Sequence, residues 1–277
     1  MADAGLGFHN ASVRAARLLH QKKHRQTQRC FLLEGTQALA EALRARAPIQ
    51  RVFALPGALS KESTDELRAL GADLHAVDRR TIDSLAQTQT PQPVVSVVRF
   101  LHHDTEALAQ LVPSGEPVTV LVLPDLADPG NAGTLIRAAA AFGAKAICFG
   151  PRAVDPYNDK VVRASMGALF RIPLVIFEQW SSFADALRAA QLTIVGTAAG
   201  GSDVRSVTLP ERAALLVGQE RRGLAGIPEA DVALVVGIPQ VPGVESLNAS
   251  VAGAIALYEL ERAHGRFRPT SARTSDA

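Results

Sequence analysis

The sequence predicts an α/β protein with two domains, the second of them built on a parallel sheet. Apolar segments of strand length alternate with segments of helical periodicity along most of the chain. In the C-terminal half the strand-like segments, such as "VTVLVL" and "AALLV", are almost continuously apolar. Runs of this kind are typical of parallel strands covered by helices on both faces. The polar, turn-rich stretch 103–117 is expected to link the two domains.

Composition indicates a soluble globular protein. The 277 residues suffice for one large domain or two ordinary ones, and 47% are hydrophobic and 20% charged. No apolar run approaches the roughly 18 residues that cross a bilayer, and the N-terminus lacks the pattern of a secretion signal. Cys30 and Cys148 lie far apart and form neither a disulfide framework nor a metal spacing. We therefore expect a cytoplasmic protein without membrane contact or bound metal.

Charge is distributed unevenly along the chain. The overall net charge is only +2, but residues 1–30 hold six arginines and lysines and a single aspartate. A basic segment of this kind favours a polyanion such as RNA as partner, although a solvated basic helix would carry the same charges. Phe8 is the one aromatic residue in this segment, so no platform for stacking bases is evident there.

The first domain, residues 1–102, is expected to be a small α/β unit with a basic N-terminal helix. Helices are expected at 12–26, 36–47, 60–71 and 78–87, and strands at 29–35, 49–56, 73–78 and 93–100. Thr36 is the expected N-cap of its helix.

The second domain, residues 118–264, is expected to contain longer apolar strands. They are expected at 118–126, 145–150, 172–177, 192–198, 213–218 and 232–239. The tail 265–277 is polar, shows no apolar periodicity and is expected to be disordered.

Three loops that follow predicted strands hold the polar residues of chemical interest. The first reads "DPGNAGTLIRAAAAFG", with a helix expected to begin near Thr134 and Arg137 on its first turn. Free N–H groups at a helix start suit an anion or a polar ligand. A dinucleotide-binding turn is an alternative, but the glycines are not spaced as G-x-G-x-x-G. A purely structural turn would account for the glycines but not for Asn131 and Arg137.

The second loop, "LVGQERRGL", places Gly218 and Glu220 after a strand, and the third, "IPQVPGVESLNAS", holds Glu245, Ser246 and Asn248. One of these polar side chains is enough to cap the following helix. The others are spare. Since ligands of α/β proteins bind at the carboxyl ends of parallel strands, we expect the three loops to form one ligand site.

In these three segments, "DPGNAGTLIRAAAAFG", "LVGQERRGL" and "IPQVPGVESLNASVAGAIALYE", the chain closely resembles the SpoU/TrmH branch of the SPOUT superfamily, the RNA ribose 2'-O-methyltransferases. The segment "RCFLLEGTQALAEAL" resembles the L30e-like substrate-binding domain of the ribosomal RNA members. The resemblance implies a SPOUT domain with a deep trefoil knot at 118–264, an L30e-like RNA-binding domain at 1–102, and a homodimer.

The resemblance also implies a site without metal that binds S-adenosylmethionine and a target ribose. The implied cofactor-binding residues are Thr197, Gly218, Ile238 and Leu247, and the implied catalytic residues are Asn131, Arg137, Glu220, Ser246 and Asn248. A guanidinium stays protonated at any physiological pH, so Arg137 is expected to bind phosphate and stabilise alkoxide charge rather than accept a proton. Glu220 is an open candidate for the proton acceptor.

The helix after Asn248 carries Val251, Ala254, Ile255 and Tyr258 on one side, with the small residues Ala252, Gly253 and Ala256 around them. Its periodicity alone indicates a core helix, whereas the resemblance favours a dimer interface. For function, 23S ribosomal RNA is the leading expected substrate, in a housekeeping or an antibiotic-resistance role. The alternatives are a transfer RNA methyltransferase, a catalytically silent RNA-binding protein and a nicotinamide oxidoreductase.

Overall fold

The structure is a computed structural model that describes residues 6–219, 223–241, 243, 246–265 and 267. The chain forms two compact units. The first comprises residues 1–102, 128–137 and 154–173, and the second comprises residues 103–127, 138–153 and 174–277. Glu220, Glu245 and all of the predicted tail except Gly265 and Phe267 lie outside the described residues.

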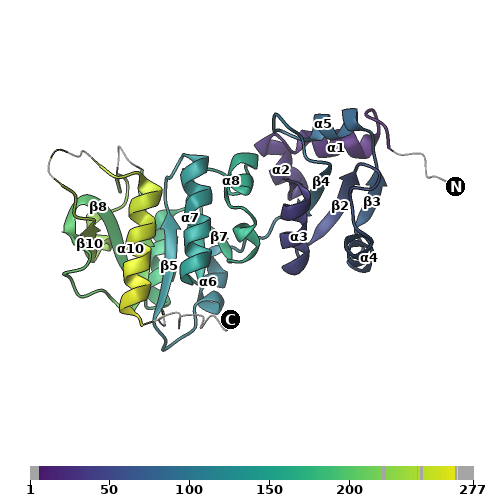
Figure 1. The fold of residues 1–277 in the computed structure, drawn as a ribbon. Helices are drawn as coiled ribbons and strands as arrows, with labels where there is room; N and C mark the ends of the chain where they lie inside the picture. Colours follow the sequence, from purple (N-terminus) through teal and green to yellow (C-terminus); the bar gives the residue numbers. More distant parts are fainter. Residues whose placement is uncertain (1–5, 220–222, 242, 244–245, 266, 268–277) are drawn as a thin grey trace, which may run out of the picture. The chain divides into compact units, whose positions relative to one another are not determined.

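The first unit contains a four-stranded mixed sheet in the order β1-β4-β2-β3 (Figure 1). Its strands are β1 (Cys30–Glu34), β2 (Ile49–Ala54), β3 (Asp73–Ala76) and β4 (Val94–Arg99). β4 pairs antiparallel with β1 and β2, whereas β3 runs parallel to β2. Its helices are α1 (Ala11–Leu18), α2 (Lys22–Gln28), α3 (Thr36–Arg44), α4 (Lys61–Ala69), α5 (Arg79–Leu85) and α8 (Asp159–Ala164), with a 3-10 turn, η2 (Ala168–Phe170).

Two local expectations for this unit are wrong. The helix expected at 12–26 is broken into α1 and α2, because Leu19 turns into the core at 2% exposure and ends the first helix. The N-cap of α3 is Gly35 rather than Thr36. Gly35 has φ +105°, a conformation that glycine adopts far more readily than residues with a side chain.

The break between α1 and α2 is stabilised by a buried ion pair. The guanidinium of Arg25 donates to the carbonyls of Leu19 and His20 at 3.0 and 2.9 Å, which satisfies the end of α1. The same group donates to the Asp155 carboxylate at 2.6 and 3.0 Å. Arg25 is 4% exposed, so this cation of the basic segment has a structural role and is not presented to solvent.

The second unit contains a six-stranded parallel sheet in the order β10-β8-β9-β5-β6-β7. Its strands are β5 (Val118–Leu123), β6 (Ala146–Phe149), β7 (Leu174–Ile176), β8 (Thr193–Asp203), β9 (Arg212–Leu216) and β10 (Leu234–Gly237). Every pairing between them is parallel, and the central strand β5 is buried at all its positions. The predicted fold class, a parallel-sheet domain with a smaller mixed α/β domain, is confirmed; the trefoil knot stays a prediction.

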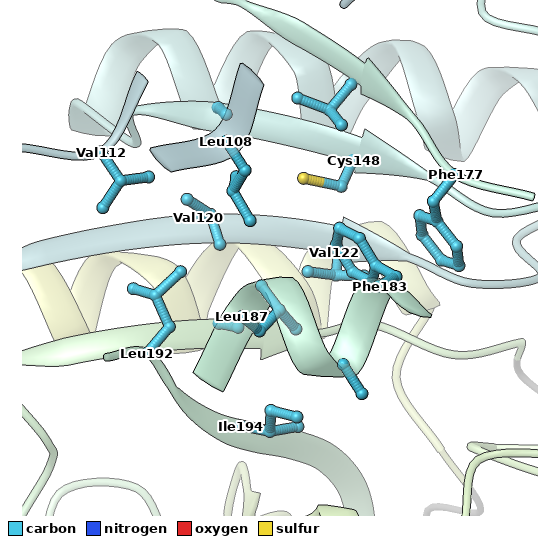
Figure 2. Packing of buried hydrophobic residues seen from close by; sticks show 14 of the residues in the cluster. Leu108, Val112, Val120, Val122, Cys148, Phe177, Phe183, Leu187, Leu192 and Ile194 are labelled. Atoms are coloured by element: carbon cyan, nitrogen blue, oxygen red, sulfur yellow. The ribbon is translucent and has the colours of Figure 1, made fainter. Parts of the chain in front are cut away.

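One face of this sheet packs against α6 (Leu108–Leu111) and α9 (Trp180–Ala189), as Figure 2 shows. Phe183 of α9 stacks on Phe177 with ring centroids 4.0 Å apart. Burial in this cluster raises the pKa of the Cys148 thiol far above its usual range, because the thiolate would lose its hydration. The other face is covered by α10 (Ala249–Ala263), which packs on β5, β8 and β10 (Figure 1).

The segment 103–117, expected to be a linker, contains a 3-10 turn, η1 (Thr105–Ala107), followed by α6. Leu108 and Val112 are 1% and 3% exposed within the core of the second unit. The segment therefore folds with that unit. Among the residues described, none of the helices has the length and apolar character that a membrane span requires.

The Arg25–Asp155 pair gives a stability prediction for the first unit. We expect Arg25→Ala to lower the free energy of unfolding by about 3–5 kcal/mol, because it leaves a buried carboxylate without its counter-charge. Urea denaturation followed by circular dichroism measures the loss. Arg14→Ala, which removes an exposed cation of α1, is the matched control and should change stability by less than about 0.5 kcal/mol. Equal losses in the two variants would contradict the structural role of Arg25.

Candidate functional site

A pocket lies at the carboxyl ends of β8, β9 and β10, where the segments that follow these strands meet the start of α10. Thr197, Gly218, Ile238 and Leu247, the four predicted cofactor-binding residues, all line it, together with Ser246. They come from positions spread over the last third of the chain. The structure thus brings to one place residues that the sequence offers only as separate loops.

The turn after β9 explains the two glycines of "GQERRG". Gln219 and Gly223 form an antiparallel bridge, with N–H···O distances of 3.2 and 2.8 Å. A Cβ on Gly218 would lie 1.9 Å from the carbonyl oxygen of Gly223, so only glycine permits this approach. Gly223 has φ +54°, in the left-handed region. Glu220, the open candidate for the proton acceptor, lies between Gln219 and Gly223 in the sequence but outside the described residues.

At the start of α10, the polar residues Asn248 and Ser246 of the third loop have different roles. Asn248 is the N-cap: its Oδ1 accepts from the main-chain N–H of Ser250 at 2.9 Å and of Val251 at 3.3 Å. The Ser250 hydroxyl donates to the same oxygen at 2.6 Å. Ser246 is exposed at the pocket and takes no part in this cap. One asparagine oxygen therefore starts the helix, and Ser246 remains available to a ligand.

The helix of the first loop begins earlier than expected. α7 (Pro129–Phe142) starts five residues before Thr134, because Asp128 accepts the Asn131 N–H at 2.7 Å and Pro129 occupies the first helical position. Asn131 is consequently a residue of the first turn rather than of the loop. Arg137 lies beyond the first turn, contrary to expectation.

Asn131 and Arg137 belong to the first unit, where their environments differ. Asn131 is 8% exposed, whereas Arg137 is exposed and makes no hydrogen bond or ion pair with any residue that the structure describes. Gly133, between them, allows α7 to pack on Ala164, since a Cβ there would lie 2.3 Å from the Ala164 Cβ. This packing holds the start of α7 rigidly and leaves Arg137 on its solvent side.

The pocket in the second unit has the character of a nucleoside site. None of the described residues that line it carries a charged side chain, and most of its wall is glycine, alanine and valine. The main-chain groups of Gly218, Ile238 and Leu247 make no backbone hydrogen bond within the described chain, so they are available to a ligand. Apolar walls with a few polar main-chain groups suit a flat heteroaromatic ring.

Several residues of this pocket were missed in the sequence. Ala252 and Ala256 of α10, which the sequence indicated only as small residues that let another helix approach, form part of the pocket wall. Gln240 also lines it, and its Oε1 is buried without a hydrogen-bond partner in the described chain. The spacing of the two alanines, one helical turn apart, is the one signal that could have indicated a wall facing a ligand. The described residues include no cluster of side chains that could hold a metal ion.

Comparison with known families and proteins assigns both halves of the chain. The SpoU rRNA Methylase family matches residues 118–258, and the MRM3-like substrate binding domain matches residues 10–96. The 23S rRNA (guanosine(2553)-2'-O)-methyltransferase RlmP of Bacillus subtilis (strain 168) is 32% identical over 257 residues, which cover 91% of this chain and 96% of that protein.

Two solved structures of similar proteins contain S-adenosylmethionine. The rRNA methyltransferase from Sinorhizobium meliloti is 31% identical with a TM-score of 0.82, covering 91% of this chain and 95% of that one. The SpoU methyltransferase AviRb from Streptomyces viridochromogenes is 28% identical with a TM-score of 0.82, covering 94% and 100%. With its sequence match, its parallel sheet and its pocket at the carboxyl edge in agreement, this chain belongs to the SpoU rRNA methylase family.

Proposed function

We propose that the protein transfers the methyl group of S-adenosylmethionine to a ribose 2'-hydroxyl of 23S ribosomal RNA, in the cytoplasm. The observation that carries this proposal is the pocket in which Gly218, Ile238, Leu247 and Ser246 from separate motifs come together, with no charged side chain among the described residues that line it. The substrate class is supported by the similarity to a 23S rRNA 2'-O-methyltransferase over nearly the whole chain, and by the match of residues 10–96 to a substrate-binding domain.

S-adenosylmethionine supplies an electrophilic methyl group on a sulfonium, which is already a good leaving group. The protein's task is to bind and align a weakly acidic alcohol against it. Alignment of this kind is worth up to roughly 7–11 kcal/mol of the activation barrier. The main-chain groups of Gly218, Ile238 and Leu247, which make no backbone hydrogen bond within the described chain, suit the fixing of the donor.

No histidine, lysine or cysteine is among the described residues that line the pocket, so no base with a pKa near neutrality is present there. Arg137 is exposed and free to bind an RNA phosphate, and its permanent positive charge would stabilise an alkoxide as it forms. Asn131 is suited to orienting the ribose from the rigid start of α7. Ser246 extends the polar edge of the pocket, and Glu220 remains the candidate proton acceptor.

We expect Arg137→Ala to lower the rate of methyl transfer at least about 10²–10³-fold, because it removes one donor to the developing negative charge. Tritium transfer from labelled S-adenosylmethionine to transcribed 23S rRNA fragments measures the rate. Binding of S-adenosylhomocysteine, followed by calorimetry, should stay unchanged. Arg188→Ala, which removes an exposed arginine on α9, is the control and should retain full activity.

The same assay separates the alternative functions. Preferential labelling of transfer RNA would contradict the ribosomal substrate. Cofactor binding without transfer to any RNA would favour a catalytically silent RNA-binding protein. Full activity of Arg137→Ala would remove this arginine from the mechanism while leaving the reaction type intact.

Two substitutions at Asn248 separate helix capping from a direct part in the reaction. Asn248→Ala should cost about 0.5–2 kcal/mol of stability, because the N–H groups of Ser250 and Val251 lose their acceptor. Asn248→Asp keeps an accepting oxygen and should keep the stability. If the amide N–H₂ also contacts substrate, the aspartate variant will be stable but slow in the transfer assay. A stable and fully active Asn248→Asp would restrict this residue to capping.

We also propose that two copies of the chain associate through α10. Val251, Ile255 and Tyr258 lie on one face of the helix, at spacings of four and three residues. These apolar side chains are 45%, 36% and 40% exposed. Phe267, 36% exposed, extends this apolar surface, with its ring stacked on Tyr258 at 5.0 Å. A contiguous apolar face on a helix is typical of an interface, and the predicted homodimer offers a second identical face to cover it.

The dimer proposal is tested by the double substitution Ile255→Glu, Tyr258→Glu. It should convert a dimer into a monomer in size-exclusion chromatography with light scattering, because two carboxylates would be desolvated at each copy's interface. Arg262→Ala on the same helix is the control and should remain dimeric. A wild-type protein that is monomeric at tens of micromolar would rule this interface out.

A further inference from the structure

The side-chain oxygen of Gln240, Oε1, is a polar atom of the pocket that has no hydrogen-bond partner in the described chain. Gln240 follows β10 in the sequence "GIPQ", and its side chain lines the pocket together with Ile238 and Leu247. Its Oε1 is buried and accepts no hydrogen bond from any residue in the described part of the chain. Buried carbonyl oxygens nearly always have a donor, because leaving one unpaired forfeits its hydration without replacement. The missing donor is therefore to be sought on a ligand.

The surroundings of this oxygen select the kind of donor. Val217, Val236 and Ala252 line the same pocket, and no described lining residue carries a charge. Among the described lining residues a cationic donor such as an ammonium would find no counter-charge, and its desolvation would carry a high cost. A neutral N–H group on a flat ring meets the acceptor and the apolar walls together.

We propose that Gln240 is a specificity residue for the methyl donor, its Oε1 accepting a hydrogen bond from the exocyclic amine of adenine. This inference rests on the proposed function, and it assigns one side chain to the choice of nucleobase. Main-chain groups can bind the ring atoms that all purines share. The Gln240 acceptor instead distinguishes a purine with an exocyclic amine from one whose group at that position cannot donate a hydrogen bond.

Calorimetric titration with two ligands tests this assignment without an activity assay. The ligands are S-adenosylhomocysteine and its purine-riboside analogue, which has hydrogen in place of the exocyclic amine. The wild-type protein should bind the analogue about five- to a hundredfold more weakly, because Oε1 is left unpaired. Gln240→Met, similar in length but without the acceptor, should bind the two ligands within about twofold of each other.

Two further variants control for packing and charge. Gln240→Glu retains an acceptor and should retain the preference for the amine, even where the added charge weakens both ligands. Gln110→Ala removes an exposed glutamine on α6 that is not among the residues lining the pocket, and it should reproduce the wild-type affinities. Urea denaturation of each variant verifies that the fold is intact.

If folded Gln240→Met showed the wild-type ratio of affinities for S-adenosylhomocysteine and its purine-riboside analogue, the inference would be overturned. The inference would also be overturned if Gln240→Met bound S-adenosylhomocysteine more weakly than the wild-type protein but bound 5'-methylthioadenosine equally well. The oxygen would then face the amino-acid part of the ligand, which 5'-methylthioadenosine lacks. If Gln240→Met lost affinity for S-adenosylhomocysteine but not for its deoxyribose analogue, Oε1 would be assigned to the sugar, and the inference would again be overturned. If the wild-type protein bound none of these nucleosides, both the proposed function and this inference would be wrong. That result differs from one in which the ligands bind but Gln240→Met keeps the wild-type ratio, which would contradict the inference alone.

Discussion

The parallel pairing of β8 with both β9 and β10 is the constraint on which the pocket depends. Because parallel strands run in one direction, the residues that follow β9 and β10 emerge at the same edge of the sheet, beside the longer β8. The Thr197 hydroxyl donates to the Leu216 carbonyl at 3.0 Å, just beyond the last pair of β8 with β9, and ties β8 to the end of β9. β8 then bulges: Gly196 and Ser202 pair with consecutive residues of β10, and the intervening residues supply part of the pocket wall.

A pocket built in this way consists largely of main chain. Gly218 and Gly237 approach neighbouring carbonyl oxygens too closely for any side chain, which brings backbone groups to the surface of the pocket. Such groups are polar but uncharged, and they can bind the neutral parts of a nucleoside. Of the described residues that line the pocket, Gln240 is the one whose side-chain oxygen is buried without a partner, which is why the proposal above gives it the choice of base.

The first unit shows how charge counted along a sequence differs from charge presented to a partner. Arg25 is buried against Asp155, and Arg17 donates to the Phe8 carbonyl while its guanidinium lies 4.0 Å from the Phe8 ring centroid. The exposed cations of the N-terminal segment are those left over, Arg14, Lys22, Lys23 and Arg29. The segment therefore presents fewer charges to a polyanion than the sequence contains.

The sequence by itself determined the strands of both sheets, the order of the three loops and the resemblance to a family, because apolar periodicity and loop composition are local properties. It failed where a distant partner decided the outcome. Arg25 pairs with a residue 130 positions away. Leu108 and Val112 join a core most of whose other members come from five strands and α9. The start of α7 was misjudged because Asp128 and Pro129 outweighed the glycines that follow. Gln240 gave no signal at all, since an unpaired buried oxygen is defined by everything packed around it, and only the tertiary structure brings those neighbours together.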